Sequence, residues 1–347
     1  MAIALSAAVS GLEAAEPVGV KIPSSLDGEI QKCLWLAPDQ SINRKIEESK
    51  NSPAPLLVSL HTWSKGYNME NPVPPRWCEA KGWAYIAPNF RGPNNKPKAL
   101  GSDFAVQDIV DAVEWAKKNA NIDENRIYLL GGSGGGHMAL LMAGRHPEIW
   151  AGVAAFCPIT DIAKWYEFHS RTGREDRYAV MMHSACGGTL AEKPDEYARR
   201  SPVTYLKSFA ELKVYIGTGI HDGYKGSVPV CHAMWGYNAL AAPEDRIPDE
   251  LIETIVKTQK VPDGAVIDNR RIDESTNQKI LDPDYVVPIH LRRTSGNVRF
   301  TLFEGAHDIL PTQGLHWLEN QAKGRSVVWD LPPLEGDFPL EKWGLAK

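Results

Sequence analysis

The chain has 347 residues, of which 43% are hydrophobic and 23% are charged, proportions that are ordinary for a globular enzyme. Its formal net charge of −5 at pH 7 offers no basic stripe for a phosphate backbone, so nucleic-acid binding is not expected. The sequence contains no apolar run of the roughly 18 residues that a membrane-spanning helix requires, so no membrane span is expected.

The first residues look like the second half of a secretory signal. Residues 1–16 are mostly small and apolar and end near Glu13-Ala14-Ala15, which fits a cleavage site, although no Lys or Arg precedes Lys21. The pattern predicts a signal-peptide remnant and a secreted or periplasmic protein. The alternative is a disordered N-terminus on a cytoplasmic protein.

Apolar strand-like runs alternate with helix-like segments, and this order predicts an α/β fold with a mainly parallel sheet covered on both faces. The predicted strands are, in chain order, residues 56–60, 83–87, 126–130, 151–156, 212–216 and 297–303. The predicted helices are residues 106–120, 138–143 and 313–322.

Two stretches interrupt this alternation. Residues 162–200 are polar and irregular, and residues 243–294 contain five prolines with little apolar periodicity. Long loops inside a compact domain are usually functional or disordered. Because no linker or repeat divides the chain, we expect one domain over residues 17–347, with loop insertions at 162–200 and 243–294 that build the walls of a pocket.

A glycine-rich turn follows the predicted strand 126–130 and precedes the predicted helix 138–143. It reads Gly131-Gly132-Ser133-Gly134-Gly135, with glycines at the −2 and +2 positions of Ser133, as a strained strand-to-helix turn requires. The turn lacks the Lys-Ser/Thr of a phosphate-binding loop and follows several strands rather than the first, which disfavours a nucleotide site. Ser133 is therefore the predicted nucleophile.

A serine nucleophile needs a base and an acid, which in this kind of fold follow it at the ends of later strands. Asp222 lies on a glycine-rich loop after strand 212–216, and His307 follows strand 297–303 on a turn of small residues. We expect His307 to take the Ser133 proton and Asp222 to orient the imidazole. Asp161 and Asp308 are the alternative acids.

The negative charge that forms on a substrate carbonyl needs backbone N–H donors. Gly134, which follows the nucleophile, supplies one, and Trp63 in the loop after strand 56–60 is the expected second, with Thr62 or Ser64 as alternatives. The side chains expected nearest the substrate are His61, Trp165 and Trp235. Five scattered cysteines form no CxxC pair, so no metal site is expected. The acyl-serine chemistry requires no cofactor.

Taken together these residues resemble the catalytic domain of the prolyl oligopeptidase family and its esterase relatives, an α/β-hydrolase fold. The resemblance covers roughly residues 55–160 and 200–325 and implies Ser133, Asp222 and His307 as the catalytic triad. It is carried by Pro88-Asn89-Phe90-Arg91-Gly92, Asp108 with Asp111-Ala112-Val113, the turn around Ser133, Arg200-Ser201-Pro202, and Val228-Pro229 after the acid.

Two features depart from the peptidases of that family. About 50 residues precede the first predicted strand, too few for the β-propeller that those peptidases carry. Thr62 and Trp63 replace the two glycines of the common oxyanion loop. We therefore expect an esterase, and the 11 tryptophans favour a carbohydrate ester, acetyl or feruloyl, on a small molecule or a polymer. The alternatives are a small peptidase or amidase, and an inactive binding protein. The sequence does not indicate an oligomeric state.

Overall fold

The computed structural model describes residues 16–38, 52–207, 212–270, 287–334 and 343–344. Of the expected signal-peptide remnant, residues 1–15 lie outside this part of the chain. Residues 271–286 of the second expected insertion also lie outside it. Within the described ranges, every helix is too short or too polar to cross a bilayer.

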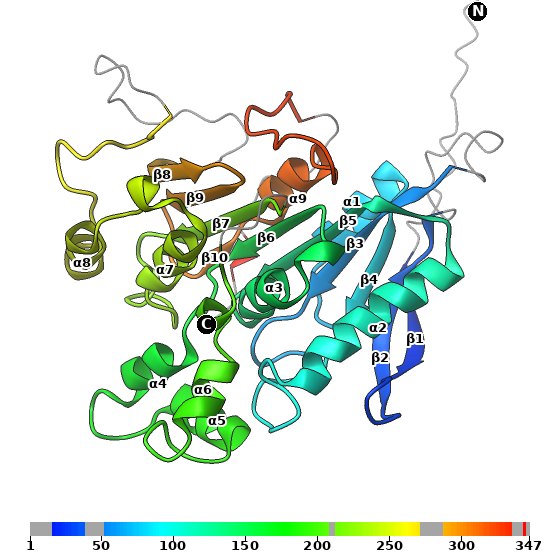
Figure 1. The fold of residues 1–347 in the computed structure, drawn as a ribbon, viewed down its shortest axis with the longest axis horizontal. Helices are drawn as coiled ribbons and strands as arrows, with labels where there is room; N and C mark the ends of the chain where they lie inside the picture. The colour runs from blue at the N-terminus through cyan, green and yellow to red at the C-terminus, as the bar shows by residue number, and fades with distance from the viewer. Residues whose placement is uncertain (1–15, 39–51, 208–211, 271–286, 335–342, 345–347) are drawn as a thin grey trace, which may run out of the picture.

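The core of the structure is one mixed sheet, with the strand order β1-β2-β4-β3-β5-β6-β7-β9-β8 (Figure 1). Its strands are β1 (Val18–Pro23), β2 (Ile30–Leu36), β3 (Ala54–Leu60), β4 (Ala84–Pro88), β5 (Ile122–Gly132), β6 (Gly152–Phe156), β7 (Val214–Gly219), β8 (Ile289–Ser295) and β9 (Val298–Phe303). The strands from β4 to β9 in this order are parallel, and β1, β2 and β8 pair antiparallel at the two edges. The mainly parallel α/β sheet is confirmed.

The strands that the sequence did not reveal are these edge strands. The side chains of β1 and β2 alternate between exposed and buried positions, and β8 carries Arg292 and Arg293 in its centre. They therefore lack the continuous apolar run of a strand that is buried on both faces. A further short pair, β10 (Asp308–Ile309) with β11 (Trp343–Gly344), forms a second, two-stranded sheet.

Helices cover both faces of the sheet, and β3 shows how the core is divided. Leu56 and Val58 pack into one apolar cluster, while Leu57 between them packs into another, because successive side chains of a strand point to opposite faces. The first cluster includes residues of α2 (Asp103–Asn119), α3 (Gly134–Arg145) and α7 (Cys231–Leu240). The second includes residues of α1 (Val73–Lys81) and α9 (Pro311–Glu319).

Residues 162–200, expected to be an irregular loop, instead form three short helices, so this expectation is wrong. They are α4 (Ile162–Ser170), α5 (Arg177–Cys186) and α6 (Pro194–Arg199), which gather at one end of the molecule (Figure 1). Asp161 and Asp176 accept hydrogen bonds from the first backbone N–H groups of α4 and α5, which stabilises both helix starts. Their buried side chains form a separate cluster around Trp63 and Trp165.

Residues 243–294 also contain regular structure. Besides β8 they include α8 (Asp249–Thr258), an amphipathic helix that buries Ile252 and Ile255. The prolines of this stretch punctuate the helix ends, since Pro248 precedes the first residue of α8.

Candidate active site

Ser133 lies between the end of β5 and the start of α3, in a strained backbone conformation with φ 57° and ψ −121°. The turn is held by a hydrogen bond from the Ser133 backbone N–H to the carbonyl of Phe156 (2.8 Å). A Cβ at Gly131 would stand 2.1 Å from the Gly135 carbonyl, and one at Gly135 would stand 2.4 Å from the carbonyl of Leu60. The close packing therefore excludes side chains at the two positions that flank the serine.

Three side chains from separate strand ends form one hydrogen-bonded chain. The Ser133 hydroxyl oxygen lies 2.8 Å from His307 Nε2, and His307 Nδ1 lies 2.6 Å from Asp222 Oδ2. Asp222 follows β7, and His307 lies between β9 and β10. Because β5, β7 and β9 are parallel members of one sheet, their carboxyl ends meet at the same edge. The structure thus brings together the three residues predicted as nucleophile, base and acid.

The Asp222 carboxylate is completely buried, and both of its oxygens are occupied. Oδ2 faces His307, and Oδ1 accepts hydrogen bonds from the backbone N–H groups of Gly223 (2.9 Å) and Val228 (3.2 Å). The alternative acids lie elsewhere: Asp161 caps α4, and Asp308 accepts from the backbone N–H of Ala306. The carboxylate of Asp222 is the one whose oxygen lies 2.6 Å from His307 Nδ1.

The protonation of His307 is governed by its pairing with Asp222. Burial by itself would lower the pKa of His307, but the negative charge of Asp222 and the hydrogen bond to it hold that pKa well above its usual value. The thiol of Cys157 lies beside this pair and is also buried, and burial raises its pKa. The pair therefore favours an imidazolium, the form that follows transfer of a proton from a serine.

The expected oxyanion loop packs directly on the helix start after Ser133. A Cβ at Gly134 would stand 2.5 Å from both the backbone nitrogen and the Cα of Trp63. The first N–H groups of a helix have no partner within the helix, so α3 directs unpaired donors at this point. The two backbone segments predicted to supply the donors are in contact, with Gly134 at the start of α3.

His61 holds the oxyanion loop in place. Its ring is buried, stacks on Phe90 with the ring centres 3.8 Å apart, and faces backbone carbonyls of Thr62 (2.9 Å) and Asn89 (2.8 Å) with its two nitrogens. Burial lowers the pKa of His61, and the hydrogen bonds with the two carbonyls offset part of that effect. These contacts tie the loop to the turn after β4 and leave the ring no free nitrogen for the substrate-binding role that the sequence suggested.

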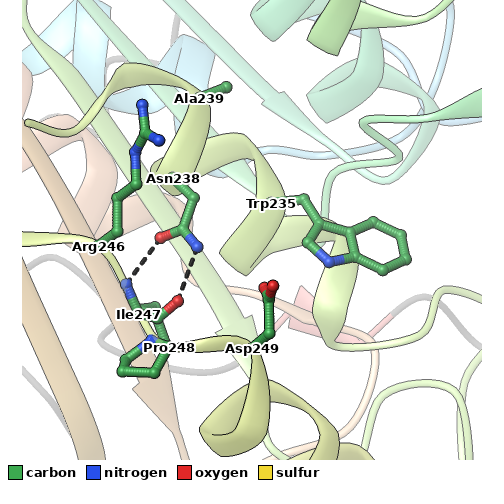
Figure 2. A pocket seen from close by; sticks show the side chains of 7 residues that line it. All are labelled: Trp235, Asn238, Ala239, Arg246, Ile247, Pro248 and Asp249. Carbon is green, nitrogen blue, oxygen red and sulfur yellow. Dashed lines mark hydrogen bonds between the residues drawn. The ribbon is translucent and has the colours of Figure 1, made fainter. Parts of the chain in front are cut away.

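The two tryptophans expected beside Ser133 differ in their surroundings. Trp165 on α4 is 1% exposed, packs edge to face on Trp63 with the ring centres 4.5 Å apart, and donates its indole N–H to the carbonyl of Ser227. Trp235 on α7 is half-buried and lines a surface pocket of about 520 Å³ (Figure 2). The residues lining that pocket include none of the Ser133–His307–Asp222 chain.

One group of side chains among the described residues has three metal-ligand atoms within reach of one another. The thiol of Cys157, a nitrogen of His307 and an oxygen of Asp222 all lie within 4.8 Å. However, His307 Nδ1 and Asp222 Oδ2 are only 2.6 Å apart, whereas two ligands each about 2.0–2.2 Å from a zinc ion at tetrahedral angles would stand farther apart. The spacing fits a shared proton rather than an ion.

Two neighbours of the site were not among the residues predicted from the sequence. Cys157 directly follows the last residue of β6, a strand-end position that could have identified it. Gly226 lies in the loop that returns past Asp222, and a Cβ there would stand 2.3 Å from Asp222 Oδ1. Only the folded path of that loop places Gly226 against the carboxylate.

Comparisons with solved structures identify the fold. An acylaminoacyl peptidase from Pyrococcus horikoshii superposes with a TM-score of 0.58 over 92% of this chain and 44% of its own, at 16% sequence identity. A prolyl oligopeptidase B from Galerina marginata superposes with a TM-score of 0.51 over 64% of this chain and 30% of its own, also at 16% identity. The fold is the α/β-hydrolase fold, with a mostly parallel sheet flanked by helices.

Comparisons of sequence point to peptidases. The chain is 26% identical over 133 residues to dipeptidyl aminopeptidase BIII of Pseudoxanthomonas mexicana, a match over 34% of this chain and 18% of that protein. It is 29% identical over 126 residues to the uncharacterized peptidase YtmA of Bacillus subtilis, over 35% of this chain and 46% of that protein. Each match thus spans less than half of the relative.

A model of the prolyl oligopeptidase family matches residues 73–247, a range that contains Ser133 and Asp222. The match extends over half of the chain and agrees with the resemblance drawn from the motifs. The chain therefore belongs to the prolyl oligopeptidase family.

Proposed function

We propose that this chain is a serine peptidase in which Ser133 attacks the carbonyl carbon of a peptide bond, His307 accepts the Ser133 proton, and Asp222 orients the imidazole. The observation that carries the proposal is the hydrogen-bonded chain Ser133 Oγ–His307 Nε2–His307 Nδ1–Asp222 Oδ2, with separations of 2.8 and 2.6 Å. Geometry of this kind activates a hydroxyl that is otherwise a weak nucleophile.

The reaction proceeds in two halves. Attack moves the Ser133 proton to His307 Nε2 and places negative charge on the substrate oxygen, which accepts hydrogen bonds from the backbone N–H groups of Gly134 and Trp63. His307 then gives its proton to the leaving amine, and an acyl-serine remains. A water molecule then attacks the acyl carbon while His307 takes one of its protons, and His307 returns that proton to Ser133 Oγ as the acyl–Oγ bond breaks and the carboxylic acid product leaves.

The same mechanism cleaves esters, so the substrate class rests on other observations. The sequence favoured a carbohydrate ester because tryptophans stack on sugars, but Trp63 and Trp165 are buried against one another. The family and both sequence relatives are named for peptidases. These observations favour the peptidase, which the sequence had offered as the alternative, over the esterase.

Matched substrates test the proposal. A dipeptidyl p-nitroanilide with a free amino terminus, an N-acetyl-aminoacyl p-nitroanilide, p-nitrophenyl acetate and a feruloyl ester are compared by kcat/KM. We expect hydrolysis of at least one anilide, loss of that activity in Ser133→Ala, and labelling of Ser133 by a fluorophosphonate. Turnover of the esters with neither anilide cleaved would restore the esterase, and absence of labelling would indicate an inactive protein.

A further inference from the structure

The loop after the proposed acid encloses it. Residues 223–228 leave Asp222, pass over its carboxylate at Gly226, and return a hydrogen bond from the Val228 N–H to Asp222 Oδ1 (3.2 Å). A Cβ at Gly226 would also stand 2.7 Å from the Cβ of His307. The position of this loop therefore determines the position of the carboxylate.

The loop is anchored from outside by helix α4. The carbonyl of Ser227, which immediately precedes Val228, lies 2.8 Å from the indole nitrogen of Trp165 and 2.9 Å from Nε2 of His169. Trp165 and His169 are four residues apart and so project from one face of the helix. Their rings also meet edge to face, with the ring centres 4.8 Å apart. The indole N–H of Trp165 and Nε2 of His169 thus contact a single carbonyl from one face of the helix.

His169 is itself fixed by a carboxylate. Its Nδ1 lies 2.6 Å from Oδ2 of Asp176, whose other oxygen accepts hydrogen bonds from the first backbone N–H groups of α5. Burial would raise the pKa of Asp176, but the hydrogen bonds from His169 and from the Ala179 N–H hold it below its usual value. A carboxylate at Nδ1 and a carbonyl at Nε2 are both acceptors, so each ring nitrogen of His169 faces one hydrogen-bond acceptor.

We propose that His169, held by Asp176, is a positioning residue that keeps Ser227 and Val228 in place and thereby fixes the carboxylate of Asp222 against His307. The inference rests on the proposed roles of Asp222 and His307. It makes the efficiency of the triad depend on α4 and α5, the helices formed by residues of the 162–200 segment. His169 touches neither Ser133 nor its partners in the hydrogen-bonded chain.

Three substitutions distinguish the contribution of the Nε2 contact of His169 from that of its Nδ1 contact. His169→Phe keeps an aromatic ring but donates no hydrogen bond. His169→Gln carries an amide nitrogen at about the reach of Nε2, and His169→Asn carries one at about the reach of Nδ1. We expect kcat to fall about 10- to 100-fold in His169→Phe and His169→Asn, with little change in KM, and to recover most of its value in His169→Gln.

A double-mutant cycle distinguishes a positioning role of His169 from a merely structural one. If His169 acts through Asp222, His169→Phe should lower kcat much less in an Asp222→Asn background than in the wild type. Equal losses in both backgrounds, or an unchanged kcat in His169→Phe, would overturn the inference. Circular dichroism melting checks that each variant folds.

A readout without substrate separates this inference from the proposed function. The NMR resonance of the proton between His307 Nδ1 and Asp222 Oδ2 reports their hydrogen bond directly, even if no substrate of the wild type is found. We expect it to shift or exchange faster in His169→Phe and to return in His169→Gln. An unchanged resonance in all three variants would also overturn the inference, whereas a wild type inactive on every substrate would count against the peptidase.

Discussion

Gly226 packs directly on the carboxylate of Asp222. A Cβ built on Gly226 would stand 2.3 Å from Asp222 Oδ1, closer than any real Cβ contact, and 2.7 Å from the Cβ of His307. The proposed acid is completely buried beneath this contact. The absence of a side chain at position 226 is therefore a condition for the hydrogen bond between Asp222 and His307.

Replacing Gly226 by alanine should displace the acid. Since loss of the aspartate function lowers kcat by about 10⁴-fold in enzymes of this type, we expect a partial displacement to lower kcat by about 10- to 1,000-fold. Gly19→Ala is the matched control, because no atom lies within 4 Å of a Cβ there and the backbone is extended. Steady-state kinetics on the best substrate measure both, and an unchanged kcat in Gly226→Ala would mean that the loop moves without moving Asp222.

The contact between Gly134 and Trp63 predicts that Gly134→Ala weakens binding of the transition state but not of the substrate. Alanine at position 134 would place a Cβ 2.5 Å from the backbone nitrogen of Trp63 and push apart the two proposed oxyanion donors. Loss of one such donor costs about 10²- to 10³-fold in kcat, so we expect a fall of that order with KM nearly unchanged. If KM rose while kcat stayed constant, the contact would serve substrate binding instead.

The strand ends explain why the sequence was so informative about the site. Ser133, Asp222 and His307 each follow a buried, apolar strand, and glycines mark all three turns. In a parallel sheet such positions converge at one edge, so chain order alone selects them. The same reasoning located six strands of the sheet, because strands buried on both faces are continuous apolar runs.

What the sequence did not reveal depends on long-range contacts. Nothing in the segment around His61 shows that its ring will face the carbonyl of Asn89, 28 residues later. The short helices of residues 162–200 have polar outer faces and bury only a few residues each, so their apolar pattern is weak. Tryptophan content suggested sugar stacking, but whether an indole is exposed or buried is decided by packing, as for Trp165.

The pairing of His307 with Asp222 predicts how activity depends on pH. Burial would lower the pKa of His307, but the charge of Asp222 raises it well above its usual value, so at low pH the ring carries the proton that blocks acceptance from Ser133. The pH dependence of kcat/KM reflects the pKa values of the free enzyme. We therefore expect kcat/KM to rise with pH as His307 loses its proton, and to level off only at alkaline pH.

Removing the negative charge of Asp222 tests whether His307 is the source of that pH dependence. In Asp222→Asn the burial that lowers the pKa of His307 remains, but the carboxylate charge that raises it is gone. The inflection of kcat/KM should therefore move to lower pH, and its high-pH plateau should fall. Profiles of kcat/KM between about pH 5 and pH 10 for the two proteins make the comparison. The same inflection in both would assign it to a group other than His307.

The buried ion pair between Arg91 and Asp108 predicts that removing either partner lowers the stability of the fold. Arg91, in the turn after β4, donates from Nε and Nη2 to both oxygens of Asp108 on α2, at 2.6 and 2.9 Å, and both side chains are buried. Removing one member leaves the other charge buried without a partner, which costs about 3–5 kcal/mol. We expect Arg91→Met to lower the free energy of unfolding by this amount, measured by urea denaturation.

The double variant separates the ion pair from the packing of the arginine stem. Arg91→Met with Asp108→Leu buries no unpaired charge, and apolar replacements of buried ion pairs are often as stable as the pair itself. It should therefore recover most of the loss of Arg91→Met. Lys98→Met, which removes an exposed cation that pairs with Asp27 and Glu29, is the control and should lower the free energy of unfolding far less than Arg91→Met. A double variant no more stable than Arg91→Met would place the loss in the packing of the stem or in the contacts of Arg91 with Asp27 and Glu29, rather than in the charge of Asp108.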